Sequence, residues 1–176
     1  LKVVKDLIRE ADVMIENFTP GVIERLGTGY DAIKAVNPSI IYAQVKGYAE
    51  DGPYRDYLSF DMIGQAAGGI MSITGEPDGR PLKPGTTLGD TGTGMLMAIS
   101  ILGALYQKRE TGQGQRLTVA MQDAMLQYAR LAFSDTMKTG KPSARAGEGV
   151  VTGGNAPMGL YPCKPGGSND YVYIYV

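Results

Sequence analysis

The sequence contains no histidine and no tryptophan, and it has a single cysteine, Cys163. Without histidine the chain cannot build a Ser-His-Asp triad, a histidine general base or the usual zinc site. One cysteine excludes an internal disulfide and a thiolate metal cluster, and it suits a reducing cytoplasm, where we expect the protein to act. Carboxylates, lysines, tyrosines and backbone amides remain for chemistry, and no metal site is expected.

An excess of charge of one sign is also lacking, because 17 basic residues stand against 18 acidic ones. A balanced surface offers no strong field to nucleic acid or to an anionic membrane. No uninterrupted apolar run reaches the roughly 18 residues of a membrane span, and the first residues do not have the pattern of a signal peptide. We therefore expect small-molecule ligands and neither nucleic acid nor membrane as a partner.

The length of 176 residues is enough for one domain with its own core. The chain begins in helical rhythm, LKVVKDLIRE, and stops inside a strand pattern, NDYVYIYV. Because domains seldom begin and end inside an element, we expect a fragment of a longer protein.

Strands and short helices alternate in the first third of the chain. The pattern predicts a helix through Arg9, a strand near 13–15, short helices in TPGVIERLG and YDAIKAVN, and a buried strand in SIIYAQVKGY. This order is typical of an α/β layer with a parallel sheet.

The remaining pattern predicts one long apolar helix and a strand pair at the end. A polar loop covers 48–58, and a helix or broken helix follows in SFDMIGQAAGGIMSITG. Next come the long helix from Thr91 to about Glu110, a strand in RLTVAM and a helix from about Gln122 to Lys138. Residues 139–157 have little periodicity, and MGLYPCK and DYVYIYV are predicted strands that form a hairpin.

One acid, Asp90, lies among glycines at the start of the long apolar helix. It has two interpretations: a structural N-cap, or an ionised group held bare at the mouth of a site by the helix dipole. An N-cap needs no flanking glycines, whereas Gly89, Gly92 and Gly94 remove side chains as the approach of a ligand requires. The glycines favour the functional interpretation.

Two other segments have weaker signals. ENFTPG follows a strand and opens a helix, where free amides and Arg25 suit a phosphate, although a solvated arginine beside an ordinary turn explains them equally well. The loop VVTGGNAPMG either covers a reacting group or only turns the chain. Cys163 is expected to pack in a strand, since no base is present to activate it.

Four motifs together, ADVMIENFTPGVIERLG, GDTGTG, RETGQGQRLTVAMQDA and TGGNAP, resemble the class III CoA-transferases of the CaiB/BaiF type, which include formyl-CoA transferase. The resemblance implies an α/β fold with a Rossmann-like parallel sheet flanked by helices. By position, it makes residues 1–139 the central part of the large CoA-binding domain. Residues 140–176 become the glycine-rich loop and strands that lead toward a small domain. Family members are considerably longer than this chain.

The same resemblance assigns roles by position. Asp90 falls on the aspartate that attacks the acyl-CoA thioester, and Gly153 and Gly154, with Asn155, fall on the glycine loop that covers the aspartyl intermediate. CoA contacts are implied for Asn17, Phe18, Thr19, Arg25, Leu58, Ser59, Phe60, Asp61 and Met121. Coenzyme A is then a co-substrate, no cofactor is tightly bound, and the partners are an acyl-CoA, a small carboxylic acid and a second copy of the chain in an interlocked homodimer.

A carboxylate can attack a thioester without a histidine base, forming a mixed anhydride and then an aspartyl-CoA thioester. Amides near Gly92 and in the glycine loop are expected to stabilise the oxyanions, and the fragment alone is expected to be inactive. Formyl-CoA transferase has a lysine and a tyrosine at the positions of Leu58 and Phe60, and a longer glycine run with a glutamine at GGNAP. The acyl donor and acceptor are therefore left open.

Two alternatives to CoA transfer remain. One is an acyl-CoA racemase of the same fold, which pairs a histidine with the aspartate; Phe60 stands near that position, so the lack of histidine disfavours it. The other is a non-catalytic fragment that binds CoA or a nucleotide. If residues 139–157 form a crossing arm, apolar faces on the Met95–Tyr106 helix and on the final strands should be exposed.

Overall fold

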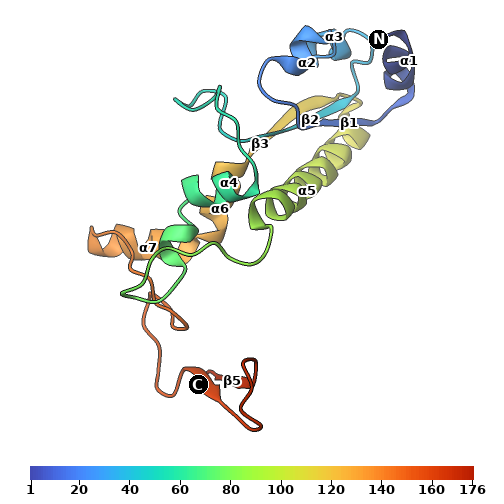
Figure 1. Ribbon diagram of the computed structural model, residues 1–176. Helices are drawn as coiled ribbons and strands as arrows, with labels where there is room; N and C mark the ends of the chain where they lie inside the picture. Colours follow the sequence, from blue (N-terminus) through green and yellow to red (C-terminus); the bar gives the residue numbers. More distant parts are fainter.

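The computed structural model describes residues 1–176, and its centre is a parallel sheet of three strands in the order β1-β2-β3 (Figure 1). The strands are β1 (Val13–Glu16), β2 (Ile41–Lys46) and β3 (Gln115–Ala120). The first four residues of β2 are buried, as in a central strand that helices cover on both faces. The predicted α/β class with a parallel sheet flanked by helices is confirmed.

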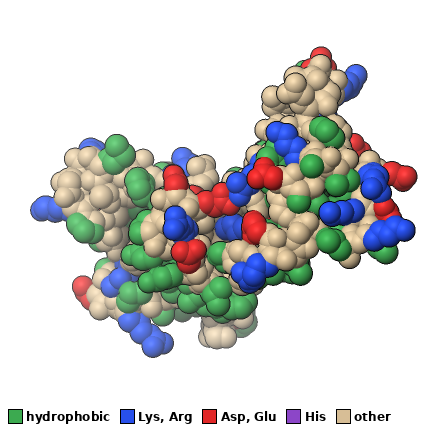
Figure 2. Space-filling model, turned by 90° about the horizontal axis from the view of Figure 1, so that it is seen from above, with side chains coloured by type: hydrophobic (Ala, Val, Ile, Leu, Met, Phe, Trp, Pro, Cys, Tyr) green, Lys and Arg blue, Asp and Glu red, His purple; other side chains and the backbone are tan.

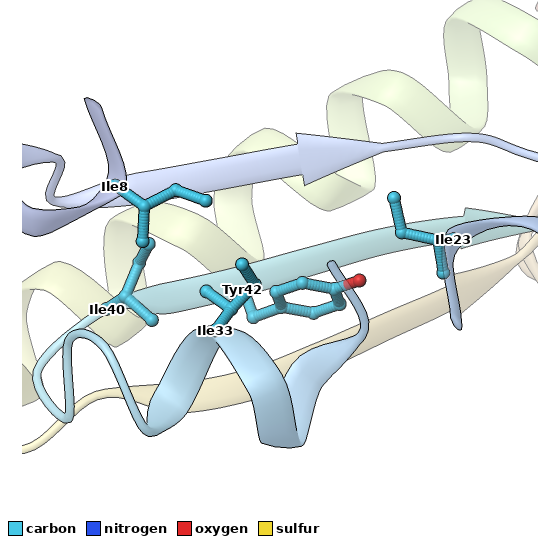
Figure 3. Close-up of a cluster of buried hydrophobic side chains, with 5 residues drawn as sticks. All are labelled: Ile8, Ile23, Ile33, Ile40 and Tyr42. Carbon is cyan, nitrogen blue, oxygen red and sulfur yellow. The ribbon is translucent and has the colours of Figure 1, made fainter. Parts of the chain in front are cut away.

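Three short helices, α1 (Lys2–Glu10), α2 (Val22–Arg25) and α3 (Tyr30–Lys34), cover one face of the sheet. One apolar cluster joins them to β2, and its members are Ile8, Ile23, Ile33, Ile40 and Tyr42 (Figure 3). Burying each of these side chains stabilises the fold by about 1.5–3 kcal/mol. The cluster packs these helices against the sheet.

Tyr42 lies at the centre of this cluster and donates a hydrogen bond from its hydroxyl to the Thr28 carbonyl over 3.1 Å. Burial, with a contribution from the Glu16 carboxylate, raises the pKa of Tyr42 to about 12 from the usual 10.0. Between these values an unfolded tyrosine has lost its proton and Tyr42 has not, so the stability that Tyr42 contributes is present below pH 10 and is lost as pH rises toward 12.

We expect Tyr42→Phe to lower the melting temperature at pH 8, because the buried Thr28 carbonyl loses a donor. Between pH 10 and 12 the difference in melting temperature between the two proteins should narrow, since only the wild type has this tyrosine to deprotonate. Thermal unfolding of both proteins at pH 8, 10 and 11 measures this difference. A difference in melting temperature that stays constant with pH would contradict the raised pKa of Tyr42.

The other face of the sheet is covered by α5 (Leu88–Thr111), which contacts β2 and β3. It begins three residues before the predicted Thr91, with Thr87 as its N-cap residue. Its length and hydropathy are sufficient for a membrane span, contrary to what the search for uninterrupted apolar runs indicated. Because α5 also packs against the helices that follow β2 and β3, it is a partly buried core helix.

A stripe on the outer side of α5 has no partner in this chain. Met95, Ile99, Leu102 and Tyr106, spaced at helical intervals, are each more than half exposed. The final strands are also exposed, and Figure 2 shows many hydrophobic side chains at the surface. The predicted exposure of both surfaces is confirmed.

A second helical layer packs around the start of α5. It contains α4 (Asp61–Ala67), the 3-10 turn η1 (Met71–Ile73), α6 (Met121–Tyr128) and α7 (Arg130–Thr139). The prediction of one helix from Gln122 to Lys138 is wrong, because the chain bends at Ala129, which ends α6 and precedes α7. Ala129 is buried in a cluster with Ile70, Ala124 and Met125. Tertiary packing sets this break, and the local sequence has no glycine or proline to mark it.

The chain after α7 leaves the helical layer. Arg145 donates hydrogen bonds to the carbonyls of Ser72, Glu76 and Gly79, and these hold the irregular segment against the loop after η1. The strands β4 (Gly159–Pro162) and β5 (Tyr171–Ile174) then form an antiparallel hairpin away from the parallel sheet (Figure 1). This confirms the predicted hairpin. The division into domains at residue 139 stays a prediction.

Candidate active site

A cavity of about 530 Å³ opens at the carboxyl ends of β1 and β2, beside the start of α5. Three short segments form most of its wall: residues 15–20, 45–47 and 57–60. Ligands in open parallel sheets bind outside the carboxyl ends of the strands, so the cavity lies where the fold favours a site.

Most residues that the sequence singled out lie together in this cavity. Its lining includes Asn17, Phe18, Thr19, Leu58, Ser59, Phe60, Asp90 and Met121. They come from four separate parts of the chain, and the sheet and α5 bring them together. Arg25, Asp61, Gly153 and Gly154 are not part of the lining.

Asp90 is in the first turn of α5, and its side chain is exposed to the cavity. The N-cap residue of α5 is Thr87, and the Asp90 carboxylate takes part in no ion pair. The N-cap interpretation is therefore wrong, while the predicted place at the helix start is confirmed. The helix dipole favours the ionised carboxylate there.

Asp61, on α4, holds the start of α5 from outside the cavity. It is buried, and its Oδ1 accepts hydrogen bonds from the Gly89 N–H at 2.8 Å and the Asp90 N–H at 3.3 Å. Its Oδ2 accepts a third from Gln65 Nε2 at 2.8 Å. A carboxylate at a helix N-terminus satisfies free donors and meets the positive end of the dipole. Asp61 thus links α4 to the backbone of Asp90, and the CoA contact implied for it stays a prediction.

Three amides in the first turn of α5 are already engaged in hydrogen bonds. The Gly89 and Asp90 amides donate to Asp61, and the Thr91 amide donates to the Thr87 carbonyl over 2.9 Å. The expectation that amides near Gly92 stabilise an oxyanion stays a prediction. The dipole of α5 favours a negative charge at Asp90.

The three glycines around Asp90 differ in what surrounds them. A Cβ at Gly89 would lie 2.5 Å from the Asp61 carbonyl oxygen, and one at Gly92 would lie 2.7 Å from the Tyr128 ring. A Cβ at Gly94 would meet nothing within 4 Å, and Gly94 lines the cavity. The interpretation that all three make room for a ligand is wrong for Gly89 and Gly92, which allow helices to pack closely.

Arg25 lies at the ENFTPG turn but outside the cavity lining. Gly21 has φ 75°, and a Cβ there would lie 2.9 Å from Arg25 Nη1, so the guanidinium rests against the turn. Arg25 forms no ion pair with an acidic residue. Its role in binding phosphate stays a prediction.

Gly153, Gly154 and Asn155 lie in the irregular segment before β4, and none of them lines the cavity. Gly153 has φ 84°, a backbone conformation that favours glycine. The structure does not bring this loop to Asp90, and its role as a cover stays a prediction.

Two charged residues of the cavity, Glu16 and Lys46, were missed by the sequence analysis. Each is the last residue of a strand of the sheet, β1 and β2 respectively. A charged residue at the end of a buried strand was the signal available, because the carboxyl ends of neighbouring parallel strands meet at one edge.

The profile of CoA-transferase family III matches residues 1–176. The formyl-CoA:oxalate CoA-transferase of Streptomyces avermitilis is 44% identical over 99% of this chain and 45% of its own length. The enzyme of that name from Escherichia coli is 39% identical with the same coverage.

Solved structures agree with the sequence relatives. A CAIB/BAIF family protein from Brucella suis superposes with a TM-score of 0.88 at 35% identity, over 99% of this chain and 44% of that one. A hypothetical protein from Mycobacterium tuberculosis superposes with a TM-score of 0.72 at 29% identity, over 81% and 40%. The chain spans about 45% of the length of the curated relatives it matches. Profile, relatives and fold agree over its whole length, and the chain belongs to CoA-transferase family III.

Proposed function

We propose that the protein moves CoA from an acyl-CoA thioester to a carboxylic acid, with Asp90 as the nucleophile. One observation carries the proposal. Asp90 presents an unpaired carboxylate at a helix N-terminus, inside the cavity that also holds most of the residues implied in CoA binding. Oxalate is the acceptor acid in the name of the S. avermitilis relative, and that name does not fix the acceptor here.

The reaction divides into attacks that need no proton transfer. The Asp90 carboxylate adds to the thioester carbonyl, the C–S bond breaks, and a mixed anhydride and a CoA thiolate form. The thiolate then attacks the Asp90 carbonyl, which releases the first acid and leaves an aspartyl-CoA thioester. The acceptor carboxylate then attacks this thioester, which releases the CoA thiolate and forms a second mixed anhydride. The thiolate attacks the acceptor's carbonyl in that anhydride, which gives the new acyl-CoA and frees Asp90. Splitting one exchange into such steps is covalent catalysis.

The absence of histidine fits this chemistry better than racemisation. A racemase moves a proton at the carbon next to the thioester and needs a base and an acid on its two sides. Phe60, which lines the cavity and stands near the position of the racemase histidine, has a hydrocarbon ring that cannot carry a proton. Racemisation is therefore the disfavoured alternative.

The proposal includes an interlocked homodimer in the cytoplasm, with the Gly153–Gly154 loop covering the intermediate. The exposed stripe on α5 and the exposed β4–β5 hairpin support it, because large apolar surfaces of this kind are normally buried against a partner or the rest of a chain. The chain spans about 45% of the curated relatives' length, and we propose that it is inactive alone.

Mass spectrometry of full-length protein tests the nucleophile. The protein is mixed with formyl-CoA and with longer acyl-CoA thioesters, and the reaction is quenched with borohydride, which reduces an aspartyl thioester to homoserine. We expect homoserine at position 90 in protein quenched during turnover and aspartate in protein quenched without substrate. Turnover with unmodified Asp90 in every sample, or trapping at another carboxylate, would overturn the mechanism.

A further inference from the structure

An ion pair at the rim of the cavity joins the ends of two strands. Glu16 Oε1 lies 2.6 Å from Lys46 Nζ and 2.6 Å from Gln44 Nε2. The pair is removed from water, since the side chains of Lys46 and Glu16 are 9% and 1% exposed. In the register of the sheet Glu16 is opposite Gln44, so the hydrogen bond between their side chains crosses directly from β1 to β2.

The two charges hold both polar groups of one peptide residue. Glu16 Oε2 accepts the Phe18 N–H over 2.8 Å, and Lys46 Nζ donates to the Phe18 carbonyl over 2.9 Å. Residues 17–19 have no regular secondary structure, so no ladder of backbone hydrogen bonds fixes them. The ion pair holds the backbone of Phe18 from both sides, and the Thr19 carbonyl accepts one further bond from the Val22 N–H.

Arg116 on β3 holds Gln44, the second side chain bonded to Glu16, in place. Gln44 Oε1 accepts a hydrogen bond from Arg116 Nε over 2.6 Å, and Arg116 also pairs with Glu50. Residues from β1, β2 and β3 therefore form one polar network beside the cavity. Such a network is rigid when all its members are satisfied.

A buried ion pair is a costly way to gain stability. The desolvation of both charges offsets much of their attraction, and apolar residues of the same size often stabilise a fold as well. Its value here lies in geometry, because the side chain of Phe18 is half exposed and lines the cavity between Asn17 and Thr19.

We propose that Glu16 and Lys46 are positioning residues that hold the Asn17–Thr19 turn in its CoA-binding conformation. The proposal rests on the proposed function and goes beyond it, because neither residue needs to touch the substrate. Without the pair the turn is free in the empty protein, and binding must order it. That cost falls on ground state and transition state alike, so it raises KM and leaves kcat nearly unchanged.

The test is steady-state kinetics of full-length Lys46→Met, Lys46→Arg and Glu16→Gln. We expect KM for the acyl-CoA to rise about tenfold in Lys46→Met, with kcat within about twofold, since ordering one backbone residue accounts for a change of this size. Lys46→Arg should restore most of the affinity, because a guanidinium can donate to both Glu16 and the Phe18 carbonyl. Glu16→Gln should raise KM as well, since it removes the charge that holds Lys46.

Lys108→Met is the matched control. Lys108 pairs with Asp12 over 2.9 Å just before β1 begins, far from the cavity, and its loss should leave both constants at the wild-type values. Melting temperatures of all variants separate loss of fold from loss of binding. If Lys46→Met does not fold, KM and kcat are compared between the wild type, Lys46→Arg and Glu16→Gln.

An unchanged KM in Lys46→Met and Glu16→Gln would overturn the proposal, and so would a fall in kcat at unchanged KM. Calorimetric titration of the wild type with CoA distinguishes this result from failure of the proposed function. Wild-type protein that binds no CoA and transfers none refutes the function itself. Wild-type binding and turnover with indifferent variants refute only the positioning role.

Discussion

Full-length protein carrying Asp90→Ala is expected to lose CoA transfer by about a thousandfold or more while it still binds CoA. The covalent route needs this carboxylate, and the variant leaves the lining that contacts CoA in place. Thioester exchange between acyl-CoA and labelled acid measures the turnover, and calorimetry with CoA measures the binding.

Two further variants sharpen this result. Asp90→Glu moves the carboxylate by about 1 Å and should lose on the order of a hundredfold. Asp123→Ala is the matched control, because Asp123 is an exposed acid in the first turn of α6 and does not line the cavity. Its turnover should match the wild type. Retained turnover in Asp90→Ala, or equal losses in both alanine variants, would remove Asp90 from the mechanism.

The second large effect concerns Asp61. Asp61→Ala should lower the free energy of unfolding by about 2–4 kcal/mol, because the buried amides of Gly89 and Asp90 and the amide of Gln65 lose their acceptor. It should also lower kcat, since the start of α5 carries Asp90. Urea unfolding and steady-state kinetics measure the two effects.

Asp61→Asn separates the contributions of Asp61. It keeps an acceptor for the amides of Gly89 and Asp90 but turns an NH₂ group toward Gln65 Nε2, so its stability should be intermediate. A different outcome would support the CoA contact that the family resemblance implied. In that case Asp61→Ala would keep its stability and its kcat, and only KM for acyl-CoA would rise.

The features that sequence predicted correctly depend on local signals. Short apolar segments placed β1 and β2, and the apolar run after Asp90 placed α5. The features that it missed depend on contacts between distant segments. Asp61 reaches an amide 28 residues away, and Lys46 reaches a carboxylate 30 residues away. No local pattern encodes such pairs. The bend at Ala129 belongs to the same class, because a packed cluster sets it.

The cavity wall starts at Ile15 and is completed only by Met121, the residue directly after β3. During synthesis roughly 100 residues must therefore be translated between the first segment of the wall and the last, which takes about 5 to 20 s. Under the proposed function, a nascent chain does not bind CoA in this interval, because the sheet edge and the start of α5 are not yet assembled. CoA would then bind only the folded state, and a concentration a hundred times its dissociation constant would add about 2.7 kcal/mol to the stability of that state. The cellular CoA supply would in that case contribute to how long the folded protein survives proteolysis.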